Sequence, residues 1–158
     1  MTAKVKAGGI IRNERLAKIG IMSAPDRPGL AFEVLQALAA VPINTQFIVQ
    51  CADLQSNSHI VLCVGEDEAS AALAALEPIR ATVKPQDIVQ QSGVAVISVF
   101  GPDFRERPSV AASVFGAMAK AQINIMAIST SISTVSCLID GKRVDDAIMA
   151  LREYFDLP

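Results

Sequence analysis

The sequence predicts an α+β protein of two ferredoxin-like modules, each an antiparallel sheet with its helices on one face. The first observation is an internal repeat: residues 27–44 recur 80 positions later as residues 107–124, with Arg-Pro at one end and Ile-Asn at the other. The second observation is the order of the elements, which reads β-α-β-β-α-β in the first copy. A repeat of this length exceeds a solenoid unit and suits a small α/β module.

The first copy begins as strand, turn and helix. Residues 17–23 alternate as a strand does, and residues 24–29 contain the Pro and Gly of a turn. Apolar residues then recur every three or four positions, which indicates a helix ended by Pro42. The stripe of this helix is Leu30, Val34, Leu38 and Val41.

The remainder of the first copy reads as two strands, a second helix and a fourth strand. Pro78 is expected to stop the second helix, whose inner face contains Ala69, Ala72, Leu73 and Leu76. The expected strands are residues 43–51, 58–64 and 81–90, with a polar turn at 53–57 and the helix at 66–76.

The second copy lacks residues for its own last strand. It supplies strands at 94–100, 123–129 and 134–139 and a helix at 110–121, and its final helix carries an apolar stripe as far as Phe155. We therefore expect the N-terminal segment, residues 5–13, to complete the second module, because an open sheet edge needs a cover. The predicted domains are residues 14–92, and residues 1–13 together with 93–158.

The bulk composition excludes several classes of protein. The chain of 158 residues is 51% hydrophobic, carries a net charge of −2 and has no cluster of Lys or Arg. Nucleic acids and anionic membrane surfaces both require a concentrated basic face, so neither is an expected partner. The longest apolar stretch, near residues 94–100, is far shorter than the roughly 20 residues that span a bilayer.

Catalytic and metal-binding constellations are not apparent. His59 is the single histidine, and we interpret it as a strand residue; no nucleophile–base pair can be built around it. Cys51, Cys63 and Cys137 lie in apolar, strand-like sequence and are expected to be reduced, buried thiols of a cytoplasmic protein. We predict no cofactor, no metal site and no enzymatic activity of the chain by itself.

The start of the first helix is a candidate site for a small carboxylate. The leading N–H groups of a helix have no intrahelical partner and carry partial positive charge. Gly29 allows a ligand close to the backbone, and the amides of Leu30 and Ala31 follow; Ser109 replaces the glycine in the second copy. The alternative is that Pro and Gly simply favour a loop-to-helix transition.

Three further polar positions have both a structural and a binding interpretation. Asn44 and Asn124 match in the repeat, and their amides either cap a helix or turn or bind the amino group of a ligand. Gln50 is a ligand contact or an outward, solvated residue. The polar stretch 129–134 is two strand ends and a turn, and Arg27, Arg105 and Arg107 are expected to be solvated loop charges.

Taken together, these segments resemble the regulatory region of aspartokinases, a tandem of ACT domains. The first domain is carried by residues 25–29, Ile43-Asn44 and Ile48-Val49-Gln50. The second is carried by residues 101–102, 107–111, 123–125, 128–131, 138–140 and 150–155, and Gly9-Ile10 resembles the segment that links the kinase domain to its ACT pair.

The resemblance implies a sensor that binds an end product of the aspartate pathway at an interface between ACT domains. It places Asp26, Gly29, Ala31 and Gln50 in one site, with Asn124 and Ile125 from a facing second module. Ser131 and the residue at Ala111 are placed near a second effector position. The predicted ligand-binding set is Asp26, Gly29, Leu30, Ala31, Asn44, Gln50, Asn124, Ile125 and Ser131.

The chain departs from the family at several positions. The family often has acidic residues where Gln46 and Met126 stand, commonly Asn at Cys51 and Thr at Ala111, and a charged segment at 132–134. An acidic group is the natural partner of a lysine ammonium, so the substitutions favour threonine, another small neutral amino acid or no ligand over lysine.

Three hypotheses about function remain open. The first is an aspartokinase-like regulatory subunit, a homodimer through its ACT domains, which senses threonine or lysine for feedback inhibition and pairs with a catalytic subunit. The second is a degenerate ACT pair that serves as a dimerisation or partner-binding scaffold without a ligand. The third is a fragment of a full aspartokinase.

Overall fold

The chain folds as two compact units in the computed structural model, which describes residues 3–102 and 104–158. The continuous unit is Arg15–Gly93, and the split unit combines the residues up to Glu14 with Val94–Pro158. The sequence places the corresponding domain boundaries after residues 13 and 92.

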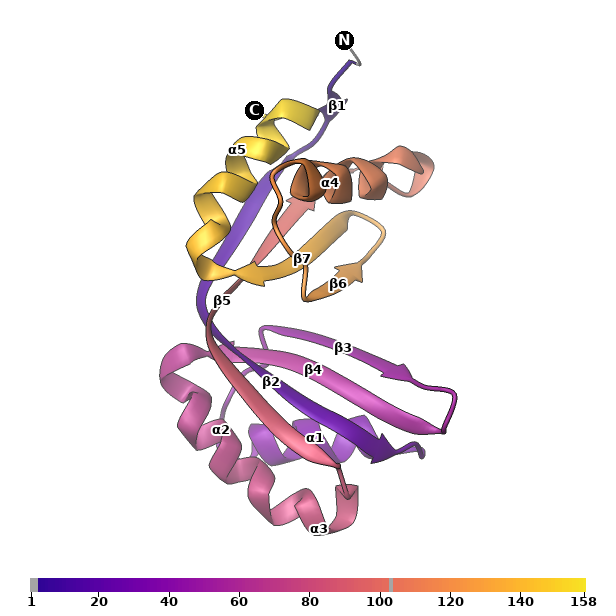
Figure 1. Ribbon diagram of the computed structural model, residues 1–158, viewed down its shortest axis with the longest axis vertical. Helices are drawn as coiled ribbons and strands as arrows, with labels where there is room; N and C mark the ends of the chain where they lie inside the picture. Colours follow the sequence, from indigo (N-terminus) through magenta and orange to yellow (C-terminus); the bar gives the residue numbers. More distant parts are fainter. Residues whose placement is uncertain (1–2, 103) are drawn as a thin grey trace. The chain divides into compact units, whose positions relative to one another are not determined.

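The continuous unit is an antiparallel sheet with its helices on one face (Figure 1). Its strand order is β3-β4-β2-β5, and β4 is antiparallel to both of its neighbours. This is the order of a ferredoxin-like βαββαβ unit. Its elements are β2 (Gly9–Pro25), α1 (Leu30–Ala39), β3 (Phe47–Ala52), β4 (Asn57–Gly65), α2 (Ala69–Leu76), α3 (Arg80–Val83) and β5 (Asp87–Phe100).

The core of the continuous unit lies between the helices and one face of this sheet. Buried residues recur along α1 at helical spacing, and alternate residues of β4 meet them from the sheet. Val41 is 44% exposed and is not part of the expected stripe, because α1 ends at Ala39 and the chain turns back with Ile43 N–H donating to Leu38 O. The buried core is Ala17, Ile19, Ile21, Ala24, Leu30, Val34, Leu38, Ile43, Ile60, Leu62, Val64, Ala69, Ala72, Leu76 and Val83.

The helical segment after β4 is longer than expected. Pro78 does not stop it, because Pro78 lies in the first turn of a new 3₁₀ segment, Glu77–Ile79, where no N–H donor is required. The helix α3 follows and ends at Val83, and the next residue, Lys84, adopts a left-handed conformation with φ 52°. The fourth strand therefore starts only at Asp87 rather than at residue 81.

The split unit repeats the same architecture, with the strand order β2-β5-β7-β6. The strand β7 is antiparallel to both β5 and β6, and α4 and α5 lie on one face of the sheet (Figure 1). Its further elements are β1 (Val5–Lys6), α4 (Ser109–Lys120), β6 (Ala127–Thr130), β7 (Thr134–Asp140), α5 (Val144–Tyr154) and β8 (Phe155–Asp156).

The N-terminal segment completes the split unit, as predicted. The strand β1 pairs in parallel with β8, with Val5 opposite Phe155. The N–H of Gly8 donates to Phe100 O at 2.7 Å, and from there β2 runs beside β5 as the fourth strand. Lys4 Nζ donates to Arg152 O, at the C-terminal end of α5, at 2.8 Å.

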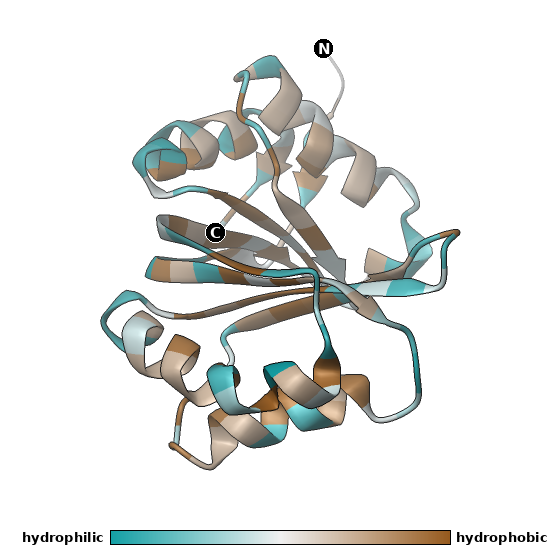
Figure 2. Ribbon diagram, turned by 60° about the horizontal axis from the view of Figure 1, so that its bottom comes forward, coloured by the Kyte–Doolittle hydropathy of each residue, from teal (hydrophilic) through white to brown (hydrophobic). Residues whose placement is uncertain are grey.

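The split unit has its own hydrophobic core. Figure 2 shows that the strands of the chain are mostly hydrophobic, whereas the helices carry both hydrophobic and hydrophilic residues. The longest helix of the described residues, α4, has 12 residues, and none combines the length and hydrophobicity needed to span a bilayer. The core residues are Ala95, Ile97, Val99, Phe104, Val110, Val114, Ala117, Met118, Ile123, Val135, Cys137, Ile139, Val144, Ala147, Leu151 and Phe155.

The three cysteines differ in their environment. Cys63 and Cys137 are buried, and burial raises the pKa of each thiol to about 12. Cys51 is exposed, so the expectation of three buried thiols is wrong at this position. It lies opposite His59 on the edge strand β3, where its side chain is uncovered within the chain.

Candidate functional site

The turn between β2 and α1 delivers backbone N–H groups to the surface of the continuous unit. Gly29 precedes the helix with φ 90°, a left-handed conformation that favours glycine. The N–H of Glu33 donates to Gly29 O at 3.0 Å, and that of Leu30 lies 3.4 Å from Arg27 O. The N–H groups of Ala31 and Phe32 are the remaining donors of this first turn, where helix geometry supplies no intrahelical acceptor.

Arg27 clamps this turn onto the helices. Its Nη2 atom lies 2.9 Å from the Glu33 carboxylate and 3.2 Å from Thr82 O. The hydrogen bond raises the pKa of the Arg27 guanidinium and lowers the pKa of the Glu33 carboxyl. Arg27 is therefore not simply a solvated loop charge. It compensates the one acidic residue in the first turn of α1, so the helix start stays suited to an anion.

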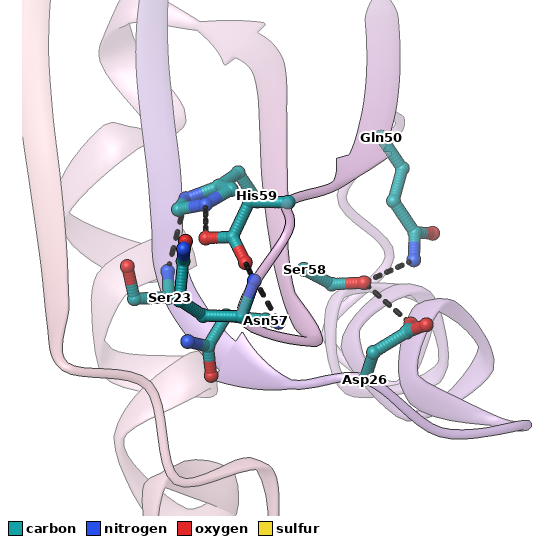
Figure 3. Close-up of polar contacts among 8 residues, drawn as sticks. Ser23, Asp26, Gln50, Asn57, Ser58 and His59 are labelled. Atoms are coloured by element: carbon teal, nitrogen blue, oxygen red, sulfur yellow. Dashed lines mark hydrogen bonds and ion pairs between the residues drawn. The ribbon is translucent and has the colours of Figure 1, made fainter.

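Asp26 and Gln50 meet at Ser58, as Figure 3 shows. Ser58 Oγ donates to Asp26 Oδ1 at 2.6 Å and accepts from Gln50 Nε2 at 3.2 Å. Ser58 is 0% exposed, whereas Asp26 and Gln50 are exposed. The N–H of Asp26 also donates to Ser56 O at 2.9 Å, which ties the turn to the β3–β4 hairpin. Two predicted site residues, Asp26 in the turn after β2 and Gln50 on β3, thus share one buried hydroxyl.

A second polar network adjoins the first through His59, the next residue of β4 (Figure 3). The N–H of Ser23 donates to His59 Nδ1 at 3.1 Å, so the ring proton resides on Nε2, which lies 2.8 Å from Asp53 Oδ2. The other oxygen of Asp53 accepts from the N–H groups of Gln55 and Asn57. The His59 hydrogen bond, followed by the backbone donors, lowers the pKa of the Asp53 carboxyl.

This network positions the strand that leads into the site. Ser23 has φ 53° and lies in an irregularity of β2, where the register with β4 shifts between Ile21 and Ala24. His59 supplies the acceptor that Ser23 needs at this point, and Asp26 follows three residues later. His59 is a strand residue, as interpreted, but its contacts show that it also holds the bulge.

The remaining predicted residues occupy different surroundings. Leu30 is 1% exposed and belongs to the core, so only its backbone faces the turn. Asn44 is exposed and follows α1, whose last carbonyls accept instead from the N–H groups of Ala40, Val41 and Ile43. Asn124, Ile125 and Ser131 belong to the split unit, as does Ala111. Asn124 and Ser131 are exposed, and Ile125 is half-buried.

Sequence reasoning missed Ser58, although a signal was present. Ile60, Leu62 and Val64 alternate inward along β4, and Ser58 occupies the same parity at the start of the strand. A hydroxyl on the buried face of a strand requires a partner there. That parity, combined with the turn at Asp26, could have identified it.

The split unit does not reproduce this arrangement. Thr130 stands at the position of Gln50. The strand β7 begins at Thr134, which is later relative to its partner β6 than the start of β4 is relative to β3. Pro108 precedes α4 with φ −60°, in contrast to the left-handed Gly29. The two copies therefore share a scaffold and differ in the chemistry at the start of the first helix.

Comparisons with known proteins agree with this architecture. A family model described as an ACT domain matches residues 97–155, within the split unit. An aspartate kinase of Stutzerimonas stutzeri is 33% identical over 149 residues, which cover 94% of this chain and 36% of that protein. An aspartokinase of Thermus thermophilus is 34% identical over 143 residues, which cover 89% of this chain and 35% of that protein. The chain thus spans about a third of the length of these curated relatives.

Solved structures match over nearly the whole chain. The ligand-free regulatory subunit of aspartate kinase from Thermus thermophilus is 31% identical, with a TM-score of 0.86, and the match covers 95% of this chain and 99% of that one. The regulatory subunit from Thermus flavus is 30% identical, with a TM-score of 0.86 and coverage of 94% and 98%. The chain therefore belongs to the family of aspartate kinase regulatory regions, which are built as a tandem of ACT domains.

Proposed function

We propose that the chain is an amino-acid-binding allosteric regulator that senses an end product of the aspartate pathway, threonine or lysine. In this proposal the continuous unit is the first ACT domain and the split unit is the second. The effector binds at the start of α1, with Asp26, Gly29, Ala31 and Gln50 as its contacts in the continuous unit. Leu30 contributes only through its backbone.

The observation that carries the proposal is the pairing of acceptors and donors at the α1 start. Asp26 and Gln50, joined through Ser58, place a carboxylate and an amide on one side. The N–H groups of Ala31 and Phe32 lie in the first turn of the helix that follows, whose macrodipole favours an anion. An α-amino acid carries an ammonium and a carboxylate on one carbon, so it complements both halves of this arrangement.

Threonine fits the side-chain chemistry better than lysine. A lysine ammonium requires an acidic partner beyond the groups that bind the α-amino end. The family often supplies acids at the positions of Gln46 and Met126, which are uncharged in this chain. Asn44, Asn124, Ile125 and Ser131 remain proposed contacts, the last three from a second ACT domain.

The proposed partners are a second copy of this chain and an aspartate kinase catalytic domain. One solved relative, 29% identical, is described as aspartokinase alpha and beta subunits, which motivates an assembly of regulatory and catalytic parts. Effector binding would inhibit phosphorylation of aspartate in the cytoplasm by favouring one packing of the ACT domains. Such coupling is typically about 1–3 kcal/mol and requires different contacts in the two states.

Titration calorimetry with L-threonine, L-lysine and other amino acids tests the proposal. We expect saturable heat with threonine at millimolar concentration or below, and its loss in Asp26→Asn combined with Gln50→Ala. Asp145→Asn is the matched control, because Asp145 is an exposed carboxylate of the split unit that pairs with Arg12. An intact dimer that gives no heat with any amino acid would instead identify the chain as a ligand-free scaffold.

A further inference from the structure

We propose that Ser58 is a positioning residue that determines which end of the Gln50 amide faces the amino-acid site. The inference rests on the function proposed above and adds a specific role for a residue in the interior of the sheet. Ser58 is 0% exposed, so it acts on a ligand only through the two side chains that it joins.

The direction of the hydrogen bonds follows from the donors that each group possesses. An ionised carboxylate only accepts hydrogen bonds, and a serine hydroxyl has one proton to donate. Ser58 uses that proton on Asp26 Oδ1 at 2.6 Å. Ser58 Oγ can then only accept from Gln50, so the amide nitrogen Nε2, 3.2 Å away, is the end that faces it. The charge on Asp26 thereby orients Gln50 through Ser58.

Cross-strand geometry explains why Ser58 reaches both residues. Gln50 is directly opposite Ile60, and Ser58 lies two residues before Ile60 on the same face of the sheet. Ser58 is therefore the diagonal neighbour of Gln50, within reach of its long side chain. Ala24 pairs with Ser58 from the other side, which brings the turn at Asp26 to the same hydroxyl.

The consequence is a site that presents acceptors to the ligand. Because its Nε2 atom donates to Ser58, Gln50 directs its Oε1 atom away from the serine. Ser58 binds only one carboxylate oxygen of Asp26, so the second oxygen is left for the ligand. Both are acceptors, and an ammonium has three donors to offer them. A reversed amide would present its own N–H groups and repel an ammonium. Ser58 thus makes the site select an amino acid over the corresponding hydroxy acid.

Nuclear magnetic resonance of the ligand-free protein tests the relay itself. We expect an Overhauser contact between the Gln50 side-chain amide protons and the Ser58 β protons, with slowed exchange of those amide protons. The slowed exchange should disappear in Ser58→Ala, which keeps β protons but has no hydroxyl, and both signals should persist in Ser98→Ala. Ser98 is a matched control because it is a strand serine of the split unit, 8% exposed, whose hydroxyl pairs with Ser136 at 2.6 Å. Gln50 amide protons that are unaffected by Ser58→Ala would overturn the inference.

Calorimetry tests the effect on selectivity, with L-threonine and 2,3-dihydroxybutanoate, in which a hydroxyl replaces the ammonium. We expect the preference of the wild type for threonine to fall about tenfold in Ser58→Ala, the size of one lost hydrogen bond. Ser58→Thr, which keeps the hydroxyl, and Ser98→Ala should retain it. An unchanged preference in Ser58→Ala would contradict the relay. Binding of neither compound by the wild type would contradict the proposed function, whereas the resonance experiment still decides the relay.

Discussion

His59 accepts a hydrogen bond at Nδ1 from the backbone N–H of Ser23, 3.1 Å away. The ring thus provides an acceptor for this N–H where the register between β2 and β4 shifts. We predict that His59→Ala destabilises the continuous unit by about 1 kcal/mol, because the Ser23 N–H loses its acceptor. Urea unfolding followed by circular dichroism measures this change. An unfolding midpoint equal to that of the wild type would show that water replaces the ring without loss.

The Asp53 carboxylate on the other side of His59 predicts a dependence on pH. The pKa of Asp53 is lowered in the folded chain, chiefly by the His59 hydrogen bond. A lowered folded-state pKa gives stabilisation that is present above the unfolded-state pKa of about 3.9 and is lost as the pH falls through the folded-state pKa. We predict that the wild type and Asp53→Asn differ most in stability near neutral pH.

The difference should shrink progressively as the pH falls below about 4. Asp53→Asn is a suitable variant because its Oδ1 atom still accepts from Gln55 and Asn57, so the turn is kept. Unfolding curves between acidic and neutral pH provide the measurement. A difference that is independent of pH would mean that the charge of Asp53 contributes nothing to stability.

The candidate site was predictable in part. Asp26 and Gly29 stand in a recognisable turn before a striped helix, and Gln50 interrupts an apolar strand. What the sequence could not supply was the register of β4 against β3 and β2, because pairing across a sheet depends on contacts between distant segments. That register places Ser58 between Asp26 and Gln50, and with it the hydrogen bonds through which Ser58 joins them.

Gly29 predicts a conformational effect that is separate from packing. A Cβ added there would have open space, with Arg27 Nη1 as its nearest neighbour at 4.0 Å, so a side chain would not clash. The φ of 90° nevertheless disfavours any L-residue. We predict that Gly29→Ala costs about 1–2 kcal/mol of stability in urea unfolding.

Gly116→Ala is the matched control for Gly29→Ala. Gly116 lies inside α4, and an added Cβ would make an ordinary contact with Tyr154 at 3.7 Å. Alanine is the better helix former, so this change should stabilise by about 0.5–1 kcal/mol. The same chemical substitution should therefore have opposite signs at the two positions. Equal signs would contradict the left-handed conformation at Gly29.

The fold could be predicted further than the site, and its errors have local causes. Repetition and periodicity indicated both modules, and the missing strand of the second copy identified the N-terminal segment as its replacement. The expectation that Pro78 ends the helical segment was wrong, because a proline can begin a new helical turn as readily as it ends one. The strand expected at residue 43 begins at Phe47, because the intervening residues turn back onto Leu38.

We predict that removing the N-terminal segment destabilises the split unit alone. Deleting the chain through Asn13 removes β1 and the start of β2, and with them the bonds of Ala7 N–H to Asp156 O and Gly8 N–H to Phe100 O. The strand β5 then becomes an uncovered edge, and β8 loses its partner. We expect hydrogen exchange to rise in β5 from Val94 onward, in β7 and in α5, while β3 and α1 in the continuous unit keep their protection. Equal loss of protection in both units would mean that the segment supports the whole chain rather than one module, and unchanged protection in β5 would show that the fourth strand contributes little to the stability of its sheet.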